Sequence, residues 1–201
     1  MLKQKTSQIK FSILEMEYGR SLVKIDYEED SQEFWISNFL SCDFFDLMEV
    51  MFWMNPNLYR AALEPLRKGP RSSFQYEEST KTWQLHWDLE GEDVYLQLTQ
   101  LSDLPNGDIE LTIKINDSEW IKAALRYKEL CYSIVKAIND IMAKQGLLGI
   151  NWTNENQDLN LRHFMHLKAY VMDLGDIDQC DGFTSYSKLE DDLKLIALRM
   201  P

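Results

Sequence analysis

The feature that most constrains the fold is a strict alternation of apolar and polar residues in the middle of the chain. In "KTWQLHWDLE", Trp83, Leu85, Trp87 and Leu89 alternate with polar side chains. This is the period of a β-strand with one buried face. The segments "RSSFQYEES", "EDVYLQLTQLS" and "DIELTIKIN" repeat the pattern. Because only the short connections "STK", "EGED" and "DLPNG" separate these segments, we expect a four-stranded antiparallel meander.

A second strand pattern lies near the start of the chain. The segment "QIKFSILEMEYGRSLVKIDYEED" contains two β-rich runs joined around "YGR". Their apolar positions are Ile9, Phe11, Ile13, Val23, Ile25 and Tyr27. Spacing by two indicates a hairpin with one apolar face. The acidic residues Glu28, Glu29 and Asp30 are expected to end this hairpin as a solvated loop.

Helices are expected to cover the sheet. Asp117 or Ser118 can cap a helix that runs to about Lys144 and is stopped by Gly146. Shorter helices are expected over residues 159–171 and 187–198. The predicted fold class is α+β: an antiparallel sheet of about six strands, formed by the N-terminal hairpin and the four-stranded meander, with helices packed on one face. At 201 residues, the chain is expected to form a single domain over residues 1–201.

The segment "SCDFFDLMEVMFWMNPN" is the most apolar helix-sized window in the chain. Its apolar part runs from Phe44 to Met54 and contains Asp46 and Glu49, so it is too short to span a membrane. The two acids are three positions apart and share one side of a helix. Packing against the sheet is the favoured interpretation. A partner groove remains open for any excess apolar surface, with Trp53 as a candidate contact.

The formal charge of −12 bears on the kind of partner to expect. Binding to nucleic acid depends on clustered Lys and Arg, so it is disfavoured. Acidity suits a freely soluble protein, or one that is steered onto a basic protein partner. The residues proposed to meet such a partner are Glu28, Glu29, Asp30, Asp176, Asp178, Asp181 and Trp53.

The cysteines and the N-terminal segment indicate a compartment. Cys42, Cys131 and Cys180 are widely separated and form no CxxC pair. Neither a disulfide framework nor a zinc knuckle is therefore predicted. The N-terminal segment has no signal-peptide core, and no window approaches the length of a membrane span. A reducing cytoplasm is the expected location.

Two segments resemble metal sites only in part. "DIDQCDG", from Asp176 to Gly182, lacks the glycine and the final glutamate that a calcium-binding EF-hand loop requires. "HFMH" places His163 and His166 three positions apart, but a zinc site needs at least one more ligand. We therefore assign no metal ligand and no cofactor.

Catalytic motifs are also missing from the sequence. It contains no GxSxG nucleophile elbow, no GxxxxGK[ST] loop and no GxGxxG. No catalytic residue is assigned. A hydrolase or metal-dependent enzyme built around His163, His166 and carboxylates remains an alternative, because such a site can be assembled by the fold alone.

The hairpin "TWQLHWDLEGEDVYLQL" and the segment "AKQGLLGINW" give the chain a broader likeness. It resembles small acidic α+β bacterial proteins of unassigned function, a group that includes immunity proteins of toxin systems. The resemblance implies a non-catalytic protein-binding domain, most concretely an immunity protein that neutralises a cognate basic toxin. A structural or self-associating module is the third hypothesis, and homo-oligomer formation stays open.

Overall fold

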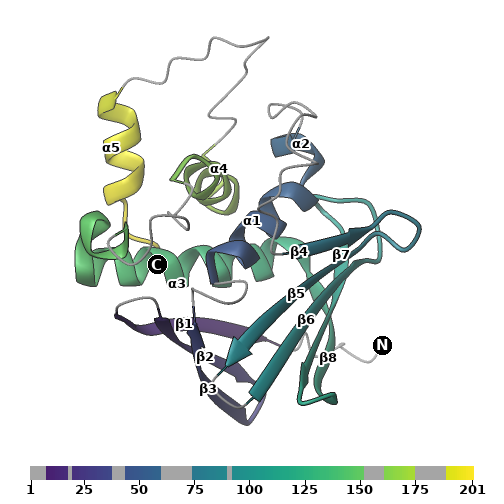
Figure 1. Cartoon of the computed structure of the whole chain (residues 1–201). Coiled ribbons are helices and arrows are strands. Elements are labelled where there is room, and N and C mark those ends of the chain that lie inside the picture. Colours follow the sequence, from purple (N-terminus) through teal and green to yellow (C-terminus); the bar gives the residue numbers. More distant parts are fainter. Residues whose placement is uncertain are drawn as a thin grey trace.

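The computed structural model of the chain combines helices with two antiparallel sheets (Figure 1). The structure describes residues 8–17, 20–37, 44–59, 74–89, 92–151, 161–174 and 189–201. The strands are β1 (Ile9–Glu17), β2 (Arg20–Tyr27), β3 (Asp30–Ser37), β4 (Phe74–Glu77), β5 (Thr82–Leu89), β6 (Glu92–Gln100), β7 (Asp108–Ile115) and β8 (Ser118–Arg126). The helices are α1 (Phe44–Met54), α2 (Pro56–Tyr59), α3 (Tyr127–Asn151), α4 (Leu161–Val171) and α5 (Leu189–Ala197). The predicted α+β class is confirmed.

The strands form two sheets instead of the single sheet of about six strands that was expected. β1, β2 and β3 pair in that order as the small sheet, and β4 to β8 pair in chain order as the large sheet. All these pairings are antiparallel. The meander from β4 to β7 is confirmed. In the chain, α1 and α2 stand between the strands of the small sheet and those of the large sheet.

The helix predicted to begin at Asp117 or Ser118 starts later, at Tyr127. Residues 118–126 instead form β8, an additional strand of the large sheet. The cause is the turn between β7 and β8, where Asn116 and Asp117 have φ values of 47° and 63°. Asn and Asp tolerate this left-handed conformation, which a two-residue hairpin turn favours. What resembled a helix cap is a hairpin turn.

The acidic cluster near residue 30 also differs from the expectation. Glu28 and Glu29 form a tight turn, but Asp30 begins β3 and pairs with Tyr27. The N-terminal hairpin is therefore continued by a third strand. Its signal is the sequence "EFWIS", in which buried Phe34 and Ile36 flank half-buried Trp35.

The most apolar segment forms α1 and belongs to the core. All its residues are buried except Asp46, Glu49 and Trp53, which are half-buried. The Phe44 ring lies 5.9 Å from that of Phe11 in the small sheet and 6.3 Å from that of Trp87 in the large sheet. α1 thus joins the inner faces of both sheets in one apolar cluster. The prediction that this helix packs against the sheet is confirmed.

The longest helix, α3, lies along the open edge of the small sheet (Figure 1). The sequence predicted that the helix would stop at Gly146; this residue has a φ of 75° that breaks the helical geometry, and helical residues resume after it to Asn151. α4 packs against both α1 and α3, and α5 packs against α4. None of the helices in the described part of the chain is long and apolar enough to cross a membrane.

The loop between β6 and β7 reaches the first turn of α3. The Gly107 carbonyl accepts a hydrogen bond from the Tyr127 amide at 3.1 Å. A Cβ atom on Gly107 would lie 2.4 Å from Ser102 Oγ and 2.6 Å from the Asp103 carbonyl oxygen. Only glycine fits here without displacing backbone atoms.

We expect Gly107→Ala to lower the free energy of unfolding by about 1–3 kcal/mol, because the added methyl group overpacks the loop. Chemical denaturation monitored by tryptophan fluorescence measures this. Asn106→Ala, at an exposed neighbouring position, is the control and should be close to neutral. Equal stability of the Gly107→Ala variant and the unmodified protein would mean that the loop relaxes freely.

Candidate functional site

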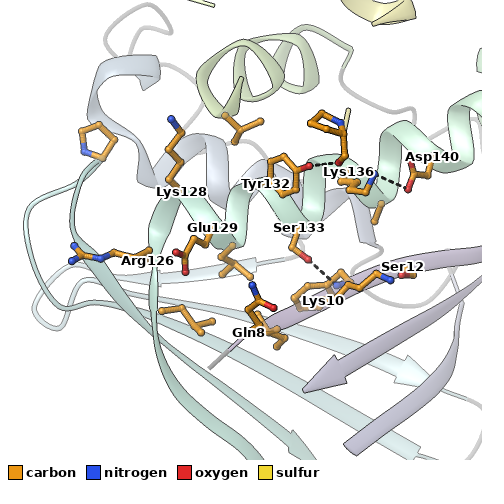
Figure 2. Close-up of a pocket in the computed structure, with 18 of the residues that line it drawn as sticks. Gln8, Lys10, Ser12, Arg126, Lys128, Glu129, Tyr132, Ser133, Lys136 and Asp140 are labelled. Atoms are coloured by element: carbon orange, nitrogen blue, oxygen red, sulfur yellow. Dashed lines mark hydrogen bonds and ion pairs between the residues drawn. The ribbon is translucent and has the colours of Figure 1, made fainter. Parts of the chain in front are cut away.

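A groove of about 830 Å³ lies between β1 and α3. Gln8 and residues 9–13 of β1 form one side, the first turns of α3 form the other, and the loop 105–107 closes one end. Figure 2 shows Lys128, Tyr132 and Lys136 along α3, opposite Gln8 and Lys10 at the start of β1. Among the described strands, β1 is an edge strand of the small sheet and β8 is an edge strand of the large sheet, and the groove lies beside the edge of β1.

Side chains of α3 cap the open edge of β1. Ser133 Oγ accepts a hydrogen bond from the Phe11 amide at 2.8 Å. Farther along, Lys144 donates to the Leu14 carbonyl and Gln145 to the Met16 carbonyl. Covering an edge in this way prevents another strand from pairing with it. The groove therefore lies beside an edge that α3 has largely occupied.

The groove has an apolar floor and a charged rim. Lys10, Arg126, Lys128 and Lys136 contribute cations to its lining, and Glu129 and Asp140 contribute carboxylates. Lys128 pairs with Asp173 at 2.5 Å, and Arg126 pairs with Asp108 at 3.3 Å. Lys136 lies 3.6 Å from Asp140 within the groove. Sequence reasoning missed this site because its walls come from segments more than a hundred residues apart.

A second candidate site is the outer face of the small sheet. Trp35 and Leu22 are paired across β3 and β2, and both are half-buried on the face opposite Val23 and Phe34. The Arg20 guanidinium lies 4.4 Å from the centre of the Trp35 ring. In Figure 1 the helices labelled α1, α3 and α4 lie on the other side of this sheet. A large aromatic side chain is thus partly open to a partner.

Carboxylates crowd the end of this face. Glu28, Glu29, Asp30 and Glu33 are exposed there, and Asp26 is half-buried. Lys24 lies 2.9 Å from Asp26, and its hydrogen bond lowers the pKa of that carboxyl below its ordinary value. The predicted cluster Glu28, Glu29 and Asp30 therefore lies on the surface at the β2–β3 turn, five residues along β3 from Trp35. Trp35 was not among the contact residues predicted from the sequence.

The two histidines of "HFMH" lie on α4, which packs against α1. His163 is buried, and its Nδ1 lies 2.5 Å from Glu49 Oε2 on α1. Its ring stacks on Phe52 with a centroid separation of 3.8 Å, and Trp53 packs against it edge-on. Within the described residues, no group of His, Cys, Asp or Glu is arranged to hold a metal ion. The contacts of His163 with Glu49, Phe52 and Trp53 join α4 to α1.

Cys131 is a poor candidate for a nucleophile. Its thiol is fully buried, and burial raises its pKa well above the ordinary value. A reactive cysteine needs a stabilised thiolate and access to substrate. Neighbouring Tyr127 is also buried, and burial raises its pKa. Because its hydroxyl donates to the Met51 carbonyl, Tyr127 ties α3 to α1.

The remaining residues predicted to contact a partner are Trp53 and the cluster Asp176, Asp178 and Asp181. Trp53 lies in the helical layer against Phe52 and His163, on the opposite side of the small sheet from Trp35. The cluster Asp176, Asp178 and Asp181 lies outside the described residues. Among the predicted contact residues, Glu28, Glu29 and Asp30 lie exposed at the turn between β2 and β3.

No protein-family model, curated protein or solved structure matches this chain. The geometry of its own residues is the basis for a functional assignment.

Proposed function

We propose that the protein is a non-catalytic protein-binding domain, and that its most concrete form is an immunity protein that neutralises a basic toxin. The observation that carries this proposal is the outer face of the small sheet. There, half-buried Trp35 and Leu22 lie toward one end of the sheet, and the exposed acidic residues Glu28, Glu29 and Asp30 lie at the turn at its other end, about 16 Å away along the strand. Buried aromatic anchors with a charged rim are typical of protein interfaces.

Charge and packing would have separate tasks at this surface. Carboxylates at the β2–β3 turn would steer a basic partner and speed its association, an effect that salt screens. Trp35 would supply most of the apolar area once the partner is bound, after Arg20 moves from its ring. The overall charge of −12 adds to the long-range attraction.

The enzyme alternative has less support from the geometry. A general base must reach its substrate, but the His163 side chain is only 8% exposed and stacks on Phe52. The Glu49–His163 pair is better explained as a link between helices. We also retain the cytoplasm as the proposed location, in keeping with the free thiol of Cys131.

The proposal predicts salt-sensitive binding to a basic protein encoded by an adjacent gene. Biolayer interferometry with each such protein should show an association rate that falls as salt is raised. Trp35→Ala should weaken binding by about 2 kcal/mol, mainly through faster dissociation. Glu29→Gln with Asp30→Asn should slow association and reduce its salt dependence.

Matched controls come from the large sheet. Tyr95 is 40% exposed on that sheet, so Tyr95→Ala removes an exposed aromatic elsewhere. Asp117→Asn with Glu119→Gln neutralises two exposed acids near another hairpin turn. Both controls should leave binding unchanged. If no adjacent basic protein binds, or if the controls weaken binding as much as Trp35→Ala does, the proposal fails. Light scattering on the isolated protein would separately reveal self-association.

A further inference from the structure

We propose that the groove between β1 and α3 binds a small amphipathic anion, with an apolar body and a carboxylate or phosphate head group. This inference does not depend on the proposed protein-binding function. It rests on the size of the groove, the capping of its strand edge and the charges of its rim.

The size and floor of the groove suit the apolar part of such a ligand. Its volume of about 830 Å³ falls within the range of roughly 300–1,000 Å³ that is typical of small-molecule sites. Ile9, Leu125, Leu130 and Val171 line it and are otherwise packed in the apolar core. An alkyl chain in the groove would extend this core and remove apolar surface from water.

An extended peptide fits the same groove less well. Strand addition needs a free row of backbone amides and carbonyls. The Phe11 amide points away from β2, because it is bonded to Ser133. The backbone amides and carbonyls of alternate residues, Ile9, Phe11 and Ile13, therefore face outward from β1. Lys144 and Gln145 occupy the edge beyond Ile13. What remains open is too short to hold a strand in register.

The rim favours a negative head group. The lining contains Lys10, Arg126, Lys128 and Lys136 against Glu129 and Asp140, a formal charge of +2 in a protein of −12. Two rim cations pair with acids outside the groove, and the side chains of these acids, Asp108 and Asp173, are 44% and 80% exposed. Exposed ion pairs are weak, so a head group within the groove can compete for the cations.

The head group is best placed along α3. Lys128, Tyr132 and Lys136 are spaced by four residues, so they form one row on the helix surface, as Figure 2 shows. Tyr132 and Lys136 already donate to the carbonyls of Pro201 and Met200. An ammonium group has three donors and can hold such a carbonyl while it also contacts an anion.

Isothermal titration calorimetry of the full chain with laurate, dodecyl phosphate and dodecanol, each below its micelle-forming concentration, tests the proposal. We expect at least one of the two anions to bind, and dodecanol to bind about tenfold more weakly or not at all. The tighter anion identifies the head group. Binding should shift the methyl NMR signals of Leu125, Leu130 and Val171.

Lys128→Gln combined with Lys136→Gln should weaken anion binding about tenfold or more, with no change for dodecanol. The control combines Lys114→Gln with Lys122→Gln, two lysines of the large sheet outside the groove. It should leave anion binding unchanged. The proposal is overturned if neither anion binds, if both double variants lose affinity equally, or if the methyl shifts miss the groove.

Discussion

Replacing His163 with leucine is expected to lower the free energy of unfolding by about 3 kcal/mol, because it leaves the Glu49 carboxylate without this hydrogen-bond partner. The imidazole is hydrogen-bonded to Oε2 of Glu49, and the other carboxylate oxygen, Oε1, is buried without a hydrogen-bond partner among the described residues. Without His163, the carboxylate would remain between helices, with only 19% of its side chain exposed. The stacking on Phe52 would also be lost. Urea denaturation at neutral pH measures the change.

A double-mutant cycle separates the pair from its surroundings. Glu49→Leu together with His163→Leu should cost less stability than His163→Leu alone, because no unpaired carboxylate is left. His166→Leu, one turn away on the same helix, is the control and should cost about 1 kcal/mol or less. Strictly additive losses would show that Glu49 and His163 do not depend on each other.

The strands were predictable because their signal is local. Alternation at Trp83, Leu85 and Trp87 needs only neighbouring residues to be recognised, and the structure places the last two in the core. Residues 118–126 were misassigned although Ile121, Ala123 and Leu125 alternate in the same way. The Asn116–Asp117 pair before them serves equally as a helix cap or a hairpin turn. Pairing with β7 decides between the two.

The candidate sites were less predictable because they depend on distant contacts. Glu49 and His163 are separated by 114 positions, and no spacing rule connects them. The groove likewise needs β1 and α3 to be placed side by side before its charges can be counted. Trp35 could have been found, since a tryptophan between buried Phe34 and Ile36 must face the opposite side of its strand.

Lys168 is a buried lysine whose place on the apolar side of a helix could have been predicted from the sequence. Lys168 follows Leu167 on the apolar side of α4 and is fully buried. Its ammonium donates to Asn139 Oδ1 at 2.5 Å and to the Ile196 carbonyl at 3.1 Å. No described carboxylate forms an ion pair with it. Lys168 therefore joins α4, α3 and α5 at the cost of desolvating its charge.

Desolvation lowers the pKa of Lys168 to about 8, whereas an unfolded lysine titrates near 10.4. Below pH 8 both states are protonated, and burial of the ammonium opposes folding. Between pH 8 and about 10.4 the unfolded state binds more protons, so this residue increases stability as pH rises. Burial raises the pKa of Cys131 and Tyr127, which gives the opposite slope above about pH 8.5 and pH 10.

These opposite changes of stability with pH partly cancel in the unmodified protein. The contribution of Lys168 is therefore best measured as the difference in stability between a Lys168 variant and the unmodified protein. Lys168→Met removes the rising slope, so its stability relative to the unmodified protein should worsen by about 2–3 kcal/mol between pH 7.5 and pH 10. Urea denaturation at several pH values measures this. Lys194→Met is the control, since Lys194 is exposed on α5 and pairs with Glu190. A stability difference for Lys168→Met that stays constant over this range would mean that burial does not disfavour the charged form, and that Lys168 acts through its hydrogen bonds alone.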